Sequence, residues 1–202
     1  MAMDQQPQLY LILPPAASAS DLAGRLSAVL DTAPVACIRI PGAGDEAELG
    51  RIADLVREIA HARDIAVVIE DHILLAQRHG LDGVHLTDGA RGIRAARKEL
   101  GADAIVGAFC GASRHDGIAA GEAGADYVSF GPVGDTALGR GTPAPQDLFA
   151  WWSEMIELPV VAEGALNRDL VTNLSPVCDF LAIGTEIWSA DDPAKALSDL
   201  WG

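Results

Sequence analysis

Basic residues are scarce in this chain of 202 residues: Lys and Arg number 14 against 29 Asp and Glu, which gives a formal net charge of −15. A protein that binds nucleic acid needs an excess of cationic side chains, so this composition argues against a nucleic-acid partner. The same deficit argues against binding to an anionic membrane surface. A local phosphate site is not excluded, because backbone N–H groups, one arginine or a metal ion can form it.

Cysteine is also rare: Cys37, Cys110 and Cys178 are widely spaced, without a CxxC pair or a His/Cys cluster. This spacing indicates neither a disulfide framework nor a zinc site, and reduced thiols are the expectation. No apolar run approaches the ~20 residues needed to cross a bilayer. The start, MAMDQQPQLYLILPP, lacks the basic residues of a signal peptide. We therefore expect a cytoplasmic protein with no membrane partner.

The chain is rich in short apolar runs that alternate with amphipathic segments. In the segment 45–62, Leu49, Ile52, Val56 and Ile59 recur at helical spacing and form one apolar stripe. The intervening runs are continuously apolar, which is typical of parallel strands covered on both faces. The eight strand candidates are LYLILP (9–14), ACIRIP (36–41), IAVVIED (65–71), GVHLT (83–87), AIVGAFC (104–110), YVSFGPV (127–133), PVVAEG (159–164) and FLAIGTEIW (180–188).

Eight strand–helix units predict one α/β domain over residues 1–202, folded as a (β/α)₈ TIM barrel. A doubly wound open sheet is the alternative, but that fold more often has five or six strands and a glycine-rich first turn. The first turn here is LPPAASAS, which contains no glycine. In a TIM barrel the site lies at the carboxyl ends of the strands, so the residues that end or follow each run are the candidates.

Several of these candidates allow two interpretations. Glu70 and Asp71 end the third run, where a carboxylate would bind Mg²⁺ or would instead cap the next helix. His85 would be a general acid or base, or a histidine hydrogen-bonded within the barrel. Gly164 and Gly184 lie where barrels often bind phosphate through backbone N–H groups, although both also suit a strand-to-helix turn.

Three segments carry a family likeness. IEDHILLAQRHGLDGVHL (69–86) is similar to a segment of the form NDR…A…A.GVHLG, GADYVSFGPV (124–133) to GADYVGFGPV, and LPVVAEGAL (158–166) to IPVVAIGGI. These segments resemble thiamine phosphate synthase and its relative, the thiazole tautomerase, and the likeness covers nearly the whole chain. It implies a (β/α)₈ barrel of thiamine biosynthesis. Such a transferase joins a hydroxymethylpyrimidine diphosphate to a thiazole phosphate and releases pyrophosphate, with Mg²⁺ on the diphosphate.

The resemblance also implies roles for individual residues. Arg39 and Arg140 take catalytic positions, where they would stabilise the departing pyrophosphate. Asp71 and Asp88 take the metal positions. The substrate and phosphate positions fall on Glu70, Thr136, Gly164, Ala165, Gly184 and Thr185.

The chain departs from the family pattern at several positions of the site. Polar or charged family residues are replaced there: glutamine, two lysines, an aspartate and a serine. The replacing residues are Cys37, Pro41, Gly139, Ala90 and Phe109.

Carboxylates are added at the same end of the predicted barrel, at Glu70, Asp88, Glu163 and Glu186. They would repel an anionic diphosphate unless a metal ion lies between. Two hypotheses therefore stay open. One is a transferase with a rebuilt pyrophosphate site; the other is a divergent or non-catalytic barrel that binds a phosphorylated small molecule. A homo-oligomer is also possible from the sequence. The apolar helix faces do not decide it, because packing of the helices on the barrel already accounts for them.

Overall fold

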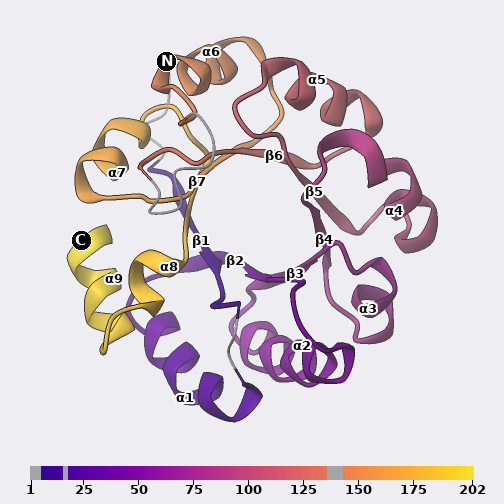
Figure 1. The fold of residues 1–202 in the computed structure, drawn as a ribbon, viewed down its shortest axis with the longest axis vertical. Coiled ribbons are helices and arrows are strands. Elements are labelled where there is room, and N and C mark those ends of the chain that lie inside the picture. Colours follow the sequence, from indigo (N-terminus) through magenta and orange to yellow (C-terminus); the bar gives the residue numbers. More distant parts are fainter. Residues whose placement is uncertain (1–5, 16–17, 136–142) are drawn as a thin grey trace.

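The computed structural model describes residues 6–15, 18–135 and 143–202, and its strands form the closed parallel barrel that the sequence predicts. The strands pair in chain order, and β8 closes the barrel against β1 (Figure 1). They are β1 (Gln8–Ile12), β2 (Val35–Ile40), β3 (Ala66–Glu70), β4 (Gly83–Leu86), β5 (Ile105–Phe109), β6 (Tyr127–Phe130), β7 (Val160–Glu163) and β8 (Phe180–Ile183).

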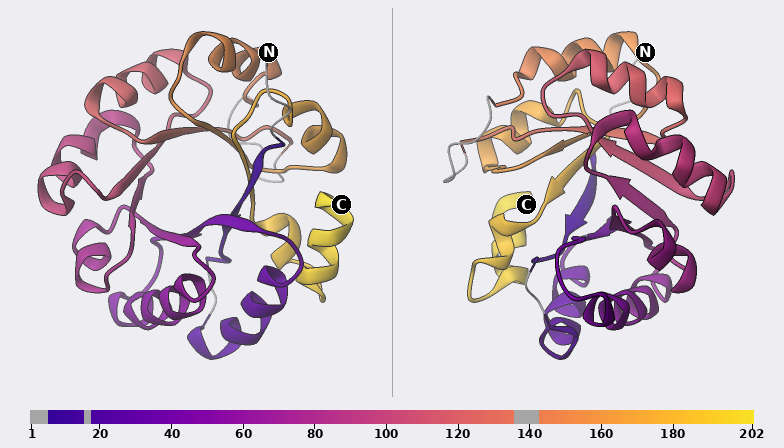
Figure 2. Two further views of the ribbon diagram at one scale, coloured as in Figure 1. Left: turned by 180° about the vertical axis from the view of Figure 1, so that it is seen from behind. Right: turned by 45° about the vertical axis from the view of Figure 1, so that its right-hand side comes forward.

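Helices surround the strands, so each strand has one face toward the barrel interior and one toward the helices (Figures 1 and 2). They are α1 (Ala19–Leu30), α2 (Glu46–His61), α3 (Ile73–Arg78), the 3₁₀ turn η1 (Gly89–Gly92), α4 (Ile93–Leu100), α5 (Arg114–Ala123), α6 (Gln146–Met155), α7 (Arg168–Leu174), α8 (Thr185–Trp188) and α9 (Pro193–Trp201). The last of them, α9, packs against α1, α7 and α8.

Capping and apolar periodicity explain where α2 forms. The carboxylate of Asp45 caps its amino end by accepting a hydrogen bond from the amide of Glu48 at 3.1 Å. Leu49, Ile52 and Val56 then bury the predicted stripe against the outer face of the strands. Burying a side chain of this size contributes roughly 1.5–3 kcal/mol. Packing of this stripe therefore holds α2 against the barrel.

Two helices end at glycines with positive φ. Gly101 ends α4 with φ 90°, and Gly124 ends α5 with φ 101°. A side chain is strained in this region of backbone conformation, whereas glycine adopts it readily. The chain can therefore reverse direction at these points and enter the next strand after a few residues.

Two predicted strands end three or more residues early in the structure. The run 127–133 stays in β6 only as far as Phe130, because Pro132 follows closely and proline has no N–H for a strand ladder. The strand predicted over 180–188 is wrong beyond Ile183, since α8 begins at Thr185. Periodicity cannot separate a strand from a helix in so short an apolar run.

Apolar side chains pack in two layers. The larger layer lies between strands and helices and receives Val128 and Phe130 of β6. Tyr127 of the same strand points the other way, into the barrel, as expected from the alternation along a strand. The inner group consists of Tyr10, Cys37, Val68, Tyr127, Val161 and Ala182.

The three cysteines are buried and form no disulfide, as the sequence predicts. Burial raises the pKa of the Cys37 and Cys110 thiols to about 12, so both stay protonated at neutral pH. Packing is therefore their role in the fold. Within the described part of the chain, no helix combines the length and apolar character that crossing a membrane requires.

Candidate active site

A buried arginine lies at the centre of the polar groups inside the barrel. Arg39 of β2 is only 5% exposed. Its Nη1 and Nη2 atoms donate to the two carboxylate oxygens of Glu163 on β7, at 2.9 and 3.1 Å. Nη1 also donates to Nε2 of His85 on β4, at 2.8 Å. Side chains from three strands therefore meet on one guanidinium.

The third side of this guanidinium faces Glu70 at the end of β3. Nε of Arg39 lies 3.1 Å from a carboxylate oxygen of Glu70, but the N–H is not aligned for a hydrogen bond. The other oxygen of Glu70 accepts from the amide of Gly42 at 3.2 Å. The predicted residues Arg39 and Glu70 are thus brought together, as an ion pair.

The electrostatics of this group keep Arg39 charged. Burial lowers the pKa of the guanidinium, but Glu163, Tyr10 and Glu70 outweigh that effect and leave the pKa raised. Burial also raises the pKa of Glu70, although Arg39 and the Gly42 amide act against it. One cation thus lies between two carboxylates. A substrate phosphate could pair with both Nη atoms of Arg39 only by displacing Glu163.

His85 is hydrogen-bonded inside the barrel, which confirms one of its two predicted interpretations. It is fully buried, and burial followed by the charge of Arg39 lowers its pKa well below the usual value. Its Nε2 faces Arg39, and its Nδ1 lies 2.9 Å from the hydroxyl of Tyr127. With both ring nitrogens occupied, His85 has no nitrogen available for proton transfer to a ligand.

Tyr10 and Tyr127 complete the group and were not predicted from the sequence. Their hydroxyl oxygens are 2.7 Å apart, and both rings are buried. A signal was present in the glycine of the apolar run AIVGAFC. Gly107 lies opposite Tyr127 on β5, and a Cβ there would lie 2.0 Å from Cζ of that ring.

Asp71 links the ends of β3 and β4. Its carboxylate accepts hydrogen bonds from the amide of Thr87 at 2.9 Å and from the Thr87 hydroxyl at 2.5 Å. Its backbone has φ 56°, a conformation that non-glycine residues rarely adopt. The alternative prediction, that Asp71 caps the next helix, is wrong, because His72 is the N-cap residue of α3.

Asp88 lies at the start of η1, and its carboxylate pairs with the exposed Arg91 at 2.9 Å. In the described ranges, no three His, Cys, Asp or Glu side chains are placed to hold a metal ion by themselves. Mg²⁺ commonly takes only one or two protein carboxylates and completes its ligand shell with water and substrate phosphates. Asp71 and Asp88, after β3 and β4, each offer carboxylate oxygens, the type of ligand that Mg²⁺ uses.

The loops after β7 and β8 have glycine where the phosphate site is predicted. Gly164 has φ 90° and packs so closely on Pro132 that a Cβ would lie 2.9 Å from its Cα. Ala165 follows with φ 57°. Thr185 is exposed at the start of α8. These residues shape the turn, and their side chains bring no charge for a phosphate.

A carboxylate accepts hydrogen bonds from backbone amides of these two loops. Glu186 accepts hydrogen bonds from the amide of Leu166 at 3.0 Å and from the amide of Gly184 at 2.7 Å. A phosphate that used these donors would have to displace Glu186. The other predicted residues, Thr136 and Arg140, lie outside the described residues.

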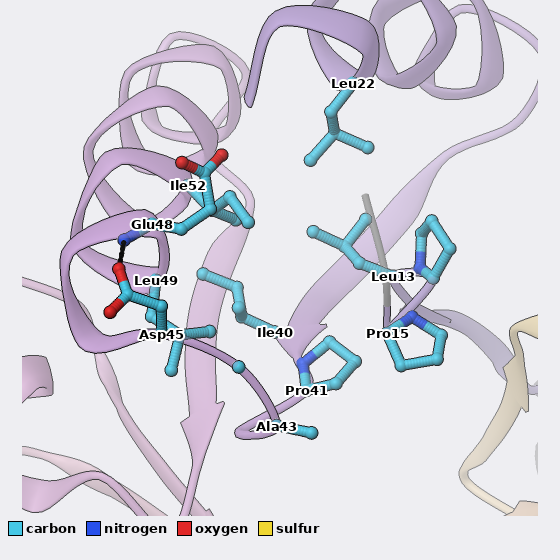
Figure 3. Close-up of a pocket in the computed structure, with 12 residues that line it drawn as sticks. Leu13, Pro15, Leu22, Ile40, Pro41, Ala43, Asp45, Glu48, Leu49 and Ile52 are labelled. Atoms are coloured by element: carbon cyan, nitrogen blue, oxygen red, sulfur yellow. Dashed lines mark hydrogen bonds between the residues drawn. The ribbon is translucent and has the colours of Figure 1, made fainter. Parts of the chain in front are cut away.

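Two cavities differ in their relation to the site. One of about 520 Å³ lies at the ends of β4 and β5 and is lined by Thr87, Asp88 and Phe109 among others. One of about 250 Å³ lies outside the barrel, between α1 and α2 (Figure 3). Ile40 points toward this second cavity, whereas Arg39 points into the barrel. Of these two cavities, the one at the ends of β4 and β5 is lined by a predicted metal residue, Asp88.

The chain is similar to known proteins along most of its length. The family model described as thiamine monophosphate synthase matches residues 9–187. The thiamine-phosphate synthase of Rhodospirillum centenum is 42% identical over 197 residues, which cover 95% of each chain. That of Erythrobacter litoralis is 41% identical over 157 residues, which cover 74% of this chain and 72% of the relative.

The fold has a counterpart among solved structures. The thiamine phosphate pyrophosphorylase from Pyrococcus furiosus superposes with a TM-score of 0.83 at 22% identity, over 98% of this chain and 95% of that one. The barrel, the family model and the two relatives agree along most of the sequence. The chain therefore belongs to the thiamine monophosphate synthase family.

Proposed function

We propose that this protein joins a hydroxymethylpyrimidine diphosphate to a thiazole phosphate and releases pyrophosphate. The observation that carries the proposal is the match to a thiamine-phosphate synthase at 42% identity over 95% of both chains. In this reaction the pyrimidine's C–O bond ionises, pyrophosphate leaves with the bonding electrons, and the thiazole nitrogen captures the carbocation. The protein must hold two rings in line and stabilise a departing anion.

Asp71 and Asp88 would hold a Mg²⁺ ion together with the diphosphate. Hydrogen bonds from Thr87 orient the carboxylate of Asp71 at the end of β3. A bound Mg²⁺ would neutralise part of the charge that develops on the leaving pyrophosphate. It would also separate the diphosphate from the surrounding carboxylates.

The charged side chains inside the barrel would act on the pyrimidine ring that ionises. Arg39, Glu70 and Glu163 lie in the barrel interior and keep fixed positions through their mutual contacts. Phe109, in the family's serine position, lines the cavity next to Asp88 and adds an apolar wall for a flat ring. In this proposal Arg39 acts through its charge, since Glu163 already occupies two of its nitrogens.

A second candidate function is binding of a phosphorylated small molecule without this chemistry. Two observations favour it: Glu163 occupies Arg39, and Glu186 occupies the amides of Leu166 and Gly184. Each carboxylate takes donors that a phosphate would otherwise use. The two functions differ in turnover, so an assay of the reaction separates them.

The test is calorimetric titration with the pyrimidine diphosphate and with the thiazole phosphate, each with and without Mg²⁺. The mixed samples are then assayed for pyrophosphate release. Binding of both compounds with release supports the transferase. Binding of one compound without release supports the second candidate, and binding of neither contradicts both.

Asp71→Asn should abolish the gain in pyrophosphate affinity that Mg²⁺ gives to the unmodified protein. We expect that gain to be at least about tenfold, or about 1.4 kcal/mol, because the carboxylate contributes its charge to the metal site. Titration with pyrophosphate at fixed Mg²⁺ measures both proteins. Asp199→Asn, at an exposed position on α9, is the charge-matched control. An equal Mg²⁺ effect in Asp71→Asn would remove Asp71 from the site.

A further inference from the structure

A continuous chain of hydrogen bonds crosses the barrel interior from β2 to β1. Arg39 contacts His85 at 2.8 Å, His85 contacts Tyr127 at 2.9 Å, and Tyr127 contacts Tyr10 at 2.7 Å. All four residues are at most 7% exposed. The chain is therefore shielded from solvent.

The position of each proton in this chain follows from chemistry. A guanidinium has only donors, so Nε2 of His85 must accept from Arg39 and carries no hydrogen. Neutral imidazole then has its proton on Nδ1, which donates to the hydroxyl of Tyr127. Among the described residues, Tyr10 is the remaining hydrogen-bond partner of that hydroxyl, so Tyr127 donates to Tyr10. One direction of donation thus runs from Arg39 to Tyr10.

Packing reinforces the same arrangement. The rings of His85 and Tyr127 stack with their centroids 5.7 Å apart and an interplanar angle of 21°. The guanidinium of Arg39 lies 5.7 Å from the centroid of the Tyr10 ring, within the range of a cation–π contact. Tyr10 therefore supports the arginine directly as well as through the chain.

We propose that Tyr127, with Tyr10 behind it, is a positioning residue that acts through His85 to fix the guanidinium of Arg39. The inference rests on the proposed function for its catalytic consequence. If the proton of His85 moved to Nε2, two N–H groups would face each other at 2.8 Å, and Arg39 would have to shift. Arg39 selects this tautomer because a guanidinium can only donate, and the hydroxyl of Tyr127 anchors the ring by accepting from Nδ1–H.

Tyr127→Phe tests the proposal, because it removes one hydroxyl and keeps the ring. We expect the ¹⁵N resonances of the His85 ring in the unmodified protein to show a protonated Nδ1 and a bare Nε2. In Tyr127→Phe this tautomer should persist, because Arg39 still donates to Nε2, but the Nδ1–H resonance should shift as it loses its acceptor, and the Arg39 Nε–H resonance should shift with it. We also expect kcat to fall about tenfold while the affinities for both substrates stay within about twofold, since a misplaced group affects the transition state most.

Ser129→Ala is the matched control on the same strand. Ser129 is fully buried, and its hydroxyl has no hydrogen-bond partner in the described structure. Ser129→Ala also deletes a buried hydroxyl, two residues after Tyr127 on β6, but this hydroxyl takes no part in the chain of hydrogen bonds. We expect the His85 and Arg39 resonances and kcat to stay unchanged in this variant.

The outcomes separate the inference from the proposed function. An unchanged Arg39 Nε–H resonance or an unchanged kcat in Tyr127→Phe would overturn the positioning role. Should the unmodified protein release no pyrophosphate, the proposed function fails, and the structural part is then judged from the His85 Nδ1–H and Arg39 Nε–H resonances. A shift of the Arg39 Nε–H resonance in Tyr127→Phe, absent in Ser129→Ala, would still support a role in fixing Arg39.

Discussion

Glu163→Ala is expected to lower the free energy of unfolding by about 3–5 kcal/mol, because it leaves a buried cation short of its principal partner. Arg39 is 5% exposed, and Glu163 accepts from both of its Nη atoms. Glu70 remains nearby, but its contact with Nε is not an aligned hydrogen bond. Urea denaturation followed by circular dichroism measures the change.

Two further variants make this result specific. Glu46→Ala breaks a solvent-exposed ion pair with Arg78, whose N–O distance is 3.1 Å, and should cost less than about 1 kcal/mol. The double variant Arg39→Met with Glu163→Leu removes the buried cation together with its principal partner, leaves only the partly exposed Glu70 unpaired, and should recover part of the lost stability. A cost for Glu163→Ala as small as that for Glu46→Ala would show that Glu70 alone neutralises Arg39.

Gly107→Ala is expected to destabilise the barrel by about 3 kcal/mol, at the upper end of the usual cost of overpacking. A Cβ at this position would lie 2.0 Å from Cζ and 2.4 Å from the hydroxyl oxygen of Tyr127. The ring cannot move aside without breaking its hydrogen bonds to His85 and Tyr10. Thermal and urea denaturation measure the loss.

Gly24→Ala is the control for this substitution. Gly24 lies within α1, and a Cβ there would meet no atom within 4 Å. Alanine should therefore raise the stability by about 0.5–1 kcal/mol, through its better helix propensity. Adding Tyr127→Leu to Gly107→Ala should restore stability by relieving the clash. Equal stability of Gly107→Ala and the unmodified protein would contradict the packing of Tyr127 against β5.

Much of the fold could be read from the sequence, because each strand–helix unit carries its own pattern. The predicted stripe of α2 is a local signal, and the structure confirms it. The glycines that end α4 and α5 are local signals of the same kind. The eighth strand was predicted too long. Ile187 and Trp188 are apolar whether they lie in a strand or a helix, so only packing against the outer core distinguishes the two.

The candidate site was less predictable, because its contacts join residues far apart in the chain. Position at a strand end correctly places Arg39 and Glu70 together. It does not reveal that Glu163, 124 positions after Arg39, occupies both of its Nη atoms. The role of Glu186 between the loops after β7 and β8 is equally invisible, since it depends on how the two loops approach.

The sequence by itself determined the eight-unit barrel, the family and the end of the barrel at which the polar residues gather. These features depend on periodicity, turn residues and segments that are continuous in the chain. Only the tertiary structure decided which donor meets which acceptor. Closing the barrel brings β1, β2, β4, β6 and β7 around one interior, where Tyr10, Arg39, His85, Tyr127 and Glu163 meet. In that low-dielectric space, burial and pairing set the charge of each group.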